Sequence, residues 1–593
     1  MESIDERVRL KLAHALRAGD MFALFETSRE ALRIDPDDPE ARYLQALAMA
    51  RLGEPLAARR LYERNRVEAI GGEDAVALKG RILKDLAIRA ESEAQAALFR
   101  EASDAYSQAN ALSDGYFSAI NAATTAFLAG DRKRAALIAS AVGERADIRD
   151  PQSYYAAASA AEAALVRGEV ERAIDLLHAA RARADANPGM MASTCRQVGL
   201  IADRLGDAGQ AGALRDAIRP APLLHFCGHM LAAGWSGEAA VAAGIAAVLD
   251  GTGATIGYGA LACGGDIMVA EALLARGGEV HVVLPFAEED FLRESVAVGG
   301  GDWVERYQAV KAAAETVTLA TQMRSVHDDE QFAYCSQLVM GLARLRAAVM
   351  YARIFQLAVW DGSPPRGPAG TAADCAEWAR QGGETRIVPV PRERPPLARA
   401  LAAPRQEASV NWQLRSILFA DFAGFSTLDE DNLSRFLEVV MARLARVLDR
   451  HEADVLCRNS WGDAIYVVVR GPAEAAALAL EIQAALDTET LARIGLPADG
   501  GMRISLHHGP IFEHFDAVQR GPTFYGTEVT VAARIEPRVP VGAIYATQPF
   551  AALSGVASDA YHFELVGKMD LAKNYGMRTL YRLVADRPQP ATA

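Results

Sequence analysis

Two aspartates near the end of the chain have the surroundings expected of a metal site that also handles phosphate. Asp421 follows the apolar run Ser416–Phe419 and stands just before Ala423-Gly424, whereas Asp463 stands in a Gly-Asp turn between two other apolar runs. Two carboxylates completed by substrate phosphates are a usual ligand set for Mg²⁺. The pattern predicts a divalent cation held by both aspartates, although Asp463 is equally the residue type of an ordinary hairpin turn.

The elements around the aspartates predict how the two would meet. Periodicity predicts strands at 415–420, 454–459, 464–469 and 502–507 and near 518–519, 543–547 and 579–583, with helices at 433–450, 473–486 and 529–535. The order strand, helix, hairpin, helix, strand is the ferredoxin-like plan, which places the first strand beside the hairpin. Asp421 and Asp463 should therefore face each other.

The residues after Asp421 predict a phosphate cradle. Small residues and a glycine stand before the predicted helix, so backbone N–H groups at its entrance could bind phosphate oxygens. The residues of this cradle are Phe422, Ala423, Gly424, Phe425 and Ser426.

Four ordered segments resemble the motifs of the class III adenylate/guanylate cyclase catalytic domain. They are 421–426, Gly462-Asp463, 503–510 and 525–534. The resemblance implies that ATP, or GTP, is converted to the 3′,5′-cyclic nucleotide and pyrophosphate. It implies two Mg²⁺ or Mn²⁺ ions per site on Asp421 and Asp463. It also implies that Arg534 stabilises charge on the α-phosphate and Lys573 binds the triphosphate; a surface ion pair is the alternative for Arg534.

The same resemblance implies a homodimer. In that family the aspartates come from one copy and the arginine and base-reading residues from the other, and a two-fold axis relates two equivalent sites. The segment 512–521 is expected to be the dimerising arm.

Three positions depart from the family pattern. Asn459 stands where a base-selecting lysine is usual, Thr523 where its partner aspartate is usual, and Thr530 where an asparagine orients the ribose. Losing one oriented polar contact predicts turnover lower by about 10- to 1000-fold, and the choice of purine stays open. A catalytically weak, nucleotide-binding scaffold or sensor is the alternative to an active cyclase.

Residues 1–218 predict a regulatory helical region. Gly-Asp or Gly-Glu turns recur after helical segments, at spacings of 34, 77, 38 and 38 residues. A period near 34 with glycine between two helices is typical of tetratricopeptide repeats, and a generic helical bundle is the alternative. Segments 78–85 and 116–123 also resemble the adaptor-binding helical region found before some signalling kinases. We therefore expect a solenoid that binds a protein partner.

Residues 219–395 predict an α/β domain with a doubly wound parallel sheet, because apolar runs alternate with helices. Its glycine-rich segment 257–267 resembles that of Rossmann-like nucleotide-sensor domains related to cytokinin-activating enzymes and DNA-processing proteins. That resemblance implies a small nucleotide ligand, sensed or acted on, near Gly257, Gly259, Gly264 and either Asp266 or Glu271. A structural spacer, whose glycines allow tight packing, is the alternative.

Composition limits which partners, cysteine chemistry and cellular location the protein can have. The 593 residues predict several domains, and a net charge of −14 disfavours nucleic acid or an anionic membrane as the main partner. The six cysteines form no CxxC pair, and no apolar stretch is long enough to span a membrane. A cytoplasmic protein is expected, with a linker at 396–410, a cyclase-like domain at 411–585 and a disordered tail at 586–593.

Overall fold

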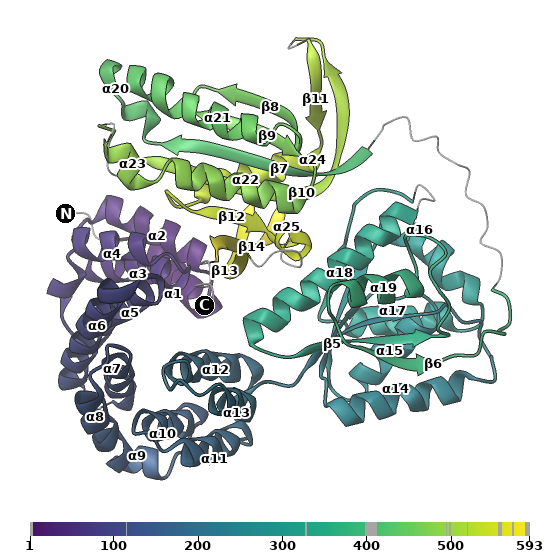
Figure 1. Cartoon of the computed structure of the whole chain (residues 1–593), viewed down its shortest axis with the longest axis horizontal. Helices are drawn as coiled ribbons and strands as arrows, with labels where there is room; N and C mark the ends of the chain where they lie inside the picture. Colours follow the sequence, from purple (N-terminus) through teal and green to yellow (C-terminus); the bar gives the residue numbers. More distant parts are fainter. Residues whose placement is uncertain are drawn as a thin grey trace. The chain divides into compact units, whose positions relative to one another are not determined.

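The computed structural model describes residues 4–113, 115–325, 329–397, 412–493, 495–496, 500–518, 520–554, 560–571 and 575–586. Most of the predicted linker and tail, and Lys573, lie outside these described residues. The chain divides into two compact units, Met1–Pro220 with Val566–Met569, and Ala221–Leu565 with Asp570–Ala593. Figure 1 shows the elements of both.

Residues 4–220 of the first unit, as far as the structure describes them, form helices and their connections. The helices are α1 (Glu6–Ala18), α2 (Met21–Ile34), α3 (Pro39–Arg51), α4 (Pro55–Arg64), η1 (Val67–Ile70), α5 (Glu73–Arg89), α6 (Ser92–Leu112), α7 (Tyr116–Leu128), α8 (Arg132–Glu144), α9 (Ala146–Arg149), α10 (Tyr154–Val166), α11 (Val170–Arg181), α12 (Pro188–Ala202) and α13 (Ala208–Ile218). Helices that follow one another pack together, as α5 does on α6 and α10 on α11.

The Gly-Asp turns explain where these helices end and begin. Gly130 has a left-handed φ of 88°, which glycine adopts without steric cost and which ends a helix. The next residue, Asp131, accepts a hydrogen bond from the backbone N–H of Arg134 and so caps α8. Each of the five glycines predicted in such turns has a positive φ. The predicted helix boundaries at these turns are therefore confirmed.

The middle of the chain forms a six-stranded parallel sheet. Its strands are β1 (Leu223–Gly228), β2 (Ile256–Gly259), β3 (Glu279–Leu284), β4 (Thr316–Leu319), β5 (Ile354–Trp360) and β6 (Thr385–Pro389). The helices are α14 (Glu238–Thr252), α15 (Gly265–Leu274), α16 (Glu288–Phe291), α17 (Trp303–Ala313), α18 (Asp329–Met350) and α19 (Thr371–Arg380), with short η2 (Leu292–Val296) and η3 (Ala297–Gly299).

The order of strands in this sheet is β4-β3-β2-β1-β5-β6, and every neighbouring pair is parallel. Helix α15 packs with α14 and α17, whereas α18 packs with α19, so that helices cover both faces. The sequence prediction of a parallel sheet alternating with helices agrees with this arrangement. Strand β1 lies between β2 and β5, where the direction of winding reverses.

The C-terminal sheet contains the predicted aspartates. Its strands are β7 (Trp412–Ala423), β8 (Val455–Trp461), β9 (Ala464–Val469), β10 (Gly501–Asp516), β11 (Gly521–Tyr525), β12 (Ile544–Thr547), β13 (Tyr561–Leu571) and β14 (Gly576–Ala585). Its helices are α20 (Glu430–Arg435), α21 (Ala442–Arg450), α22 (Pro472–Ala485), α23 (Thr488–Arg493), α24 (Thr527–Ile535) and α25 (Gln548–Ser554), with η4 (Phe425–Thr427), η5 (Phe436–Met441) and η6 (Glu536–Arg538).

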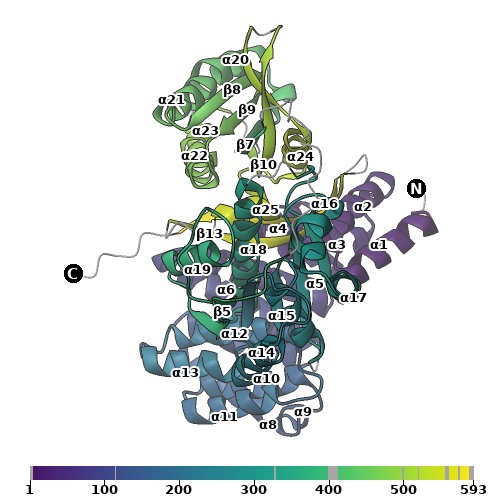
Figure 2. The ribbon, with the colours of Figure 1, turned by 90° about the vertical axis from the view of Figure 1, so that its right-hand side faces the viewer.

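The sheet order β13-β14-β12-β10-β7-β9-β8 places β7 between β9 and β10, with β11 paired to β10. Figure 2 shows α21 and α22 on one side of these strands and α24 on the other. Separate apolar cores lie on the two sides, around Phe422 and Phe436 and around Ile417 and Ala532. The predicted strand, helix, hairpin, helix, strand order is present.

Several predicted details were wrong. Strand β7 continues through Asp421 to Ala423 instead of ending at 420. The predicted helix at 433–450 starts earlier, at Glu430, and contains a π-helical segment that turns Leu437 outward, leaving it 50% exposed. Val518 lies in the turn before β11 and not in a strand, and β13 was not predicted.

Candidate active site

Asp421 lies near the end of β7 and is paired in the sheet with Arg503 of β10. The guanidinium of Arg503 forms an ion pair with the Asp421 carboxylate, and its Nε lies 3.0 Å from Oε1 of Glu536. These three side chains are 20%, 24% and 13% exposed for Asp421, Arg503 and Glu536 respectively. One cation therefore bridges two acids that are largely shielded from water.

Asp463 joins this cluster from the β8–β9 turn. Burial raises the pKa of Asp463 to about 6, and its hydrogen bond and charge repulsion with Asp421 add to the shift. Burial likewise raises the pKa of Glu536 to about 7, opposed by Arg503 and reinforced by both aspartates. The structure thus brings Asp421 and Asp463 together, as the topology predicts. Arg503 and Glu536, which sequence reasoning gave no role, lie with them.

The acid cluster has the charge to attract a divalent cation, but it supplies only some of the ligands that the ion needs. Three acids share one arginine, so negative charge is left uncompensated. Within the described parts of the chain, no group of three or more His, Cys, Asp or Glu side chains has metal-binding geometry. Mg²⁺ commonly uses one or two carboxylates, with water and substrate phosphates as the other ligands. The donor set suits an ion that arrives with a polyphosphate.

The predicted phosphate cradle has a different local structure from the one expected. Gly424 has a left-handed φ of 90° and leads into the single turn η4, whereas α20 begins only at Glu430. The rings of Phe422 and Phe425 pack against Phe436, with centroids 4.9 and 5.0 Å away. The cradle is therefore not at a helix entrance, and these two phenylalanines can offer a ligand mainly their backbone.

The predicted base-reading positions lie on β8 and β11, which are not paired with each other in the sheet, and they have different partners. Thr523 of β11 is 7% exposed and hydrogen-bonds with Cys457 of β8. The Oδ1 atom of Asn459 accepts a hydrogen bond from the Ser460 backbone N–H at 2.8 Å. Cys457 was missed by sequence reasoning. It stands two residues before Asn459, on the same face of the strand, which is the signal that could have identified it.

Arg534 and Thr530 both lie on α24. The guanidinium carbon of Arg534 lies 4.5 Å from the centroid of the Tyr575 ring, and Thr530 is half-buried. Glu536, two residues beyond Arg534, instead reaches Arg503. Arg534, near the end of α24, thus contacts Tyr575, whereas Glu536, just after this helix, contacts Arg503.

A buried contact holds α24 on the sheet. Nε2 of His507, on β10, lies 2.6 Å from Oε2 of Glu528, and its Nδ1 lies 2.8 Å from the Thr547 hydroxyl. Burial alone would raise the pKa of Glu528, but the hydrogen bond and charge of His507 hold it below its usual range. This contact positions the helix that carries Thr530 and Arg534.

The glycines predicted to lie near a ligand in the middle domain are in tight packing contacts, as the spacer alternative expects. A Cβ at Gly259 would come within 2.1 Å of the Phe226 ring, and one at Gly257 within 2.4 Å of Leu273. One at Gly264 would lie 2.5 Å from the backbone nitrogen of Leu231. Of the predicted acids, Asp266 lines a cavity, whereas Glu271 forms a two-contact ion pair with Arg306, at 2.8 and 2.6 Å.

Two further sequence expectations concern the whole chain. Across the described residues, no helix has the length and apolar character needed to cross a lipid bilayer. All six cysteines lie within the described residues, and each is a free thiol.

Comparisons with known proteins match two regions. Residues 18–126 match the family model Tetratricopeptide Repeats-Sensor, and residues 411–583 match the Adenylate and Guanylate cyclase catalytic domain. The middle domain lies between these two matched regions. A search of curated proteins found no match.

Solved structures that match part of this chain include three cyclases. The adenylyl cyclase CyaB from P. aeruginosa is 18% identical, with 30% of this chain and 98% of that chain covered and a TM-score of 0.26. The guanylate cyclase domain of RhGC from Catenaria anguillulae, in complex with GTP, is 16% identical, with coverages of 30% and 100% and a TM-score of 0.26. An adenylate cyclase from Trypanosoma brucei is 20% identical, with coverages of 30% and 92% and a TM-score of 0.26.

Residues 411–583, in which Asp421 of β7 meets Asp463 of the β8–β9 turn, match the adenylate and guanylate cyclase catalytic domain family, and residues 18–126 match the tetratricopeptide-repeat sensor family.

Proposed function

We propose that this protein is a nucleotide cyclase that converts ATP, or GTP, to the 3′,5′-cyclic nucleotide and pyrophosphate. The observation that carries the proposal is the pairing of Asp421 with Asp463 inside the region that matches the cyclase family. The two acids come from separate elements, and the charge of Asp421 adds to the raised pKa of Asp463, as happens when carboxylates share a cation site.

Asp421 and Asp463 would hold two Mg²⁺ or Mn²⁺ ions, which when bound help to ionise the ribose 3′-hydroxyl and neutralise the triphosphate. Backbone N–H groups of residues 422–426 would orient the phosphates. Arg534 would stabilise charge on the α-phosphate through its planar guanidinium, and Lys573 would add a further contact to the triphosphate.

The substrate's base and ribose would meet less usual side chains. Asn459 and Thr523 would contact the base with neutral donors and acceptors, and Thr530 would lie beside the ribose. The hydrogen bond of Thr523 with Cys457 would place Cys457 beside the base as well. We favour ATP as the substrate, with turnover below that of enzymes that keep the usual lysine, aspartate and asparagine.

The complete site requires a second copy of the chain. The resemblance to the cyclase family implies that the arginine of one copy would serve the aspartates of the other. Within one copy, Arg534 lies against Tyr575, and the acid cluster has Arg503 as its cation, which is compatible with this sharing. Apolar side chains stand exposed on the β10–β11 hairpin and at the end of β8: Trp461 is 54% exposed, Phe515 61%, Val518 93% and Tyr525 48%. Grouped exposed apolar residues are typical of interaction surfaces.

The remaining regions would regulate the cyclase. Residues 1–218 would act as a solenoid that binds a protein partner, consistent with the sensor family matched at 18–126. The middle α/β domain would respond to a small ligand.

Purified full-length protein incubated with ATP or GTP and Mg²⁺ or Mn²⁺ tests the proposal. We expect a cyclic product and pyrophosphate, detected by chromatography. Asp421→Asn should abolish product, whereas Asp449→Asn should not. Asp449 is the matched control because it is also paired with an arginine, Arg458 at 2.5 Å, but on an exposed surface.

Absence of product from either nucleotide, with nucleotide binding retained, would favour the scaffold alternative. Asn459, Thr523 and Thr530 would then account for the lost turnover, and restoring the family residues at these positions should recover it. Product that persists in Asp421→Asn would exclude the proposed site.

A further inference from the structure

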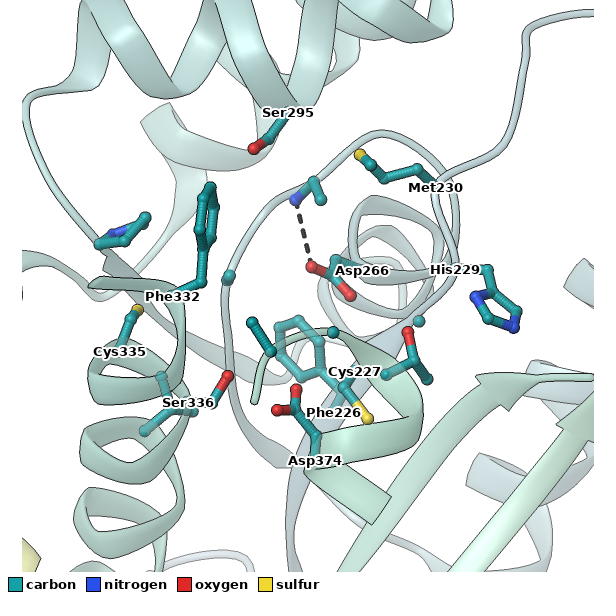
Figure 3. Close-up of a pocket in the computed structure, with 18 of the residues that line it drawn as sticks. Phe226, Cys227, His229, Met230, Asp266, Ser295, Phe332, Cys335, Ser336 and Asp374 are labelled. Carbon is teal, nitrogen blue, oxygen red and sulfur yellow. Dashed lines mark hydrogen bonds between the residues drawn. The ribbon is translucent and has the colours of Figure 1, made fainter. Parts of the chain in front are cut away.

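A cavity of about 770 Å³ lies at the carboxyl ends of the strands in the middle sheet (Figure 3). The last residues of β1, from His225 to Gly228, line it, and β1 is the strand at which the winding of the sheet reverses. Open α/β sheets bind ligands in this crevice, and the volume is in the range of small-molecule sites. The cavity is therefore a candidate binding site in its own right.

Two buried carboxyl groups face this cavity. Asp266, in the first turn of α15, is 6% exposed, and Asp374, in the first turn of α19, is 9% exposed. Oδ2 of Asp266 accepts a hydrogen bond from the Ala262 backbone N–H at 3.2 Å, and the Gly228 backbone N–H also lowers the pKa of this carboxyl group. Its Oδ1 has no hydrogen bond of normal geometry among the described residues. Figure 3 shows both carboxyl groups directed into the cavity. An acceptor is thus left open to a ligand.

The charge of these carboxyl groups is not balanced within the cavity. Burial raises the pKa of both to about 7, and repulsion from Asp374 adds to the shift of Asp266. The Ser336 hydroxyl bonds to Asp374 and opposes its shift only in part. A cation placed between the two carboxylates would relieve the cost of ionising them.

The side chains of the cavity are a poor match for a phosphate, although α15 and α19 begin beside it. None of the described lining residues is a lysine or an arginine. His225 is neutral, because burial first and Arg344 second lower its pKa to about 3. Phosphate sites depend on charge-assisted donors such as arginine. A phosphorylated nucleotide, the ligand that the glycine-rich segment suggests, is therefore a poor match.

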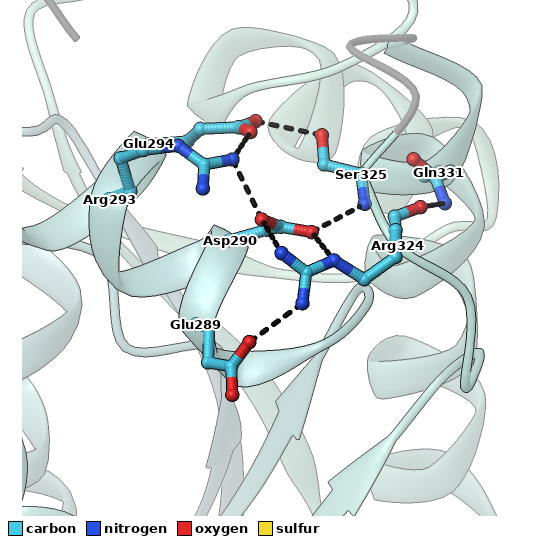
Figure 4. A network of polar contacts seen from close by, with 7 residues as sticks. All are labelled: Glu289, Asp290, Arg293, Glu294, Arg324, Ser325 and Gln331. Carbon is cyan, nitrogen blue, oxygen red and sulfur yellow. Dashed lines mark hydrogen bonds and ion pairs between the residues drawn. The ribbon is translucent and has the colours of Figure 1, made fainter. Parts of the chain in front are cut away.

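Two arginines beside the cavity-lining Glu294 are held by acids (Figure 4). Arg324 contacts Asp290 at 2.8 Å and Glu289 at 2.6 Å, and Arg293 contacts Asp290 at 2.8 Å. Glu294, which lines the cavity, lies 2.9 Å from Arg293 and accepts a hydrogen bond from the Ser325 hydroxyl at 2.9 Å. This network neutralises Glu294 and leaves Asp266 and Asp374 as the buried acids that need a counterion.

The other walls of the cavity are apolar and partly aromatic. They include the side chains of Phe226, Phe291, Phe332, Met230 and Val339. Aromatic faces attract organic cations as well as apolar rings. A bare metal ion is a poorer match, because no group of three or more metal-binding side chains occurs in the described structure.

We infer that this cavity binds a flat organic cation, an amidine or amino-heterocycle, whose N–H groups donate hydrogen bonds to Asp266 and Asp374 and whose ring lies against Phe226 and Phe332. The site belongs to the middle domain and does not depend on the cyclase reaction. The class of ligand follows from two features of the cavity: the two buried carboxyl groups lack a positively charged partner, and the walls are partly aromatic.

Isothermal titration calorimetry on the full-length protein at pH 8 tests the charge preference. Benzamidinium, benzamide and benzoate have nearly the same shape and differ in charge, and AMP represents a phosphorylated ligand. Benzamidinium should bind at least about 10-fold more tightly than benzamide, the ratio expected for hydrogen bonds to a charged group. Benzoate and AMP should not compete with it. Equal or tighter binding of benzoate or AMP at this site, or no binding of benzamidinium, would overturn the inference.

Variants locate the site. Asp266→Asn and Asp374→Asn should each weaken benzamidinium binding about 10-fold, whereas Asp302→Asn, a control at an exposed aspartate of the same domain, should not. Thermal unfolding checks that each variant is folded. If one of the two buried-site variants does not fold, the other and the probe series still decide the outcome. Unchanged affinity in the folded variants would contradict the assignment.

Discussion

Arg503 determines how three acids can lie together in the candidate active site. It forms an ion pair with Asp421 and lies 3.0 Å from Glu536, while Asp463 adds a third acid. Removing one partner of a shielded ion pair leaves the other charge uncompensated, which usually costs more than the pair contributes. Arg503 is therefore expected to stabilise the fold and to compete with a bound cation for Asp421.

Arg503→Met should lower the free energy of unfolding by about 2 kcal/mol or more. Saturating Mg²⁺ should stabilise the variant more than the wild type, because the ion then replaces the missing positive charge. Thermal unfolding with and without Mg²⁺ measures both effects. Arg470→Met is the control, since Arg470 lies 3.7 Å from Asp454 and both side chains are more exposed. Equal stability of Arg503→Met and the wild type would refute this role.

The buried carboxyl of Asp266 predicts a pH effect on stability. Its folded-state pKa is raised to about 7, above the value near 4 expected when unfolded. The folded state therefore holds the proton more tightly, and stability falls as the pH rises from about 4 through 7. Asn cannot ionise, so Asp266→Asn should gain stability relative to the wild type over this window, by at most about 1.4 kcal/mol per pH unit.

Tryptophan fluorescence in denaturant suits this measurement, because four of the six tryptophans, Trp235, Trp303, Trp360 and Trp378, lie in the middle domain. A stability difference that stays constant between pH 5 and pH 8 would contradict the assigned titration.

At the scale of the elements, helices α5 and α6 pack closely because a glycine stands where they touch. Gly80 lies in α5 against the Tyr106 ring of α6, and a Cβ at this position would come within 2.9 Å of that ring. Gly212 is also inside a helix, α13, but a Cβ there would meet nothing within 4 Å. The first glycine permits a helix contact, whereas the second only weakens its helix.

Gly80→Ala should lower the free energy of unfolding by about 1–3 kcal/mol, the usual cost of overpacking. Gly212→Ala should raise it by up to about 1 kcal/mol, because alanine favours the helix. Circular dichroism during thermal unfolding compares the two. If Gly80→Ala lowered the free energy of unfolding no more than Gly212→Ala does, α5 and α6 would be able to accommodate the added methyl group, contrary to the prediction.

At the scale of the whole molecule, the proposed function requires two copies to share each site. The acid cluster and Arg534 have different partners within one copy, and the exposed apolar residues of the β10–β11 hairpin offer a surface for association. A two-fold dimer then carries two equivalent sites, each built from both copies.

Mixing two inactive variants tests this sharing. Asp421→Ala and Arg534→Ala should each be inactive alone. In a heterodimer, one site keeps both its aspartates and its arginine, so an equal mixture that exchanges subunits should recover about a quarter of wild-type activity. Measuring product before and after subunit exchange gives the result. Mixtures that stay inactive although heterodimers form would place both residues in the same copy's site.

The sequence by itself determined the order of elements, the turns that end the repeat helices and the pairing of Asp421 with Asp463. These features follow from apolar periodicity, from Gly-Asp turns and from the order of the strands, which can be predicted without knowing how the strands are aligned in the sheet. The purine choice, the dimer and the roles of Arg534 and Thr530 remain predictions from resemblance.

Apart from the pair of Asp421 and Asp463, only the tertiary structure decided which side chains face one another across long separations. Arg503 and Asp421 are 82 residues apart and meet because β7 and β10 pair in one register. Asp266 and Asp374 converge because two helices begin at the same edge of the middle sheet, and Gly257 and Gly259 prove to be packing positions. Register and packing depend on the fit of the whole core, so local patterns do not encode these contacts.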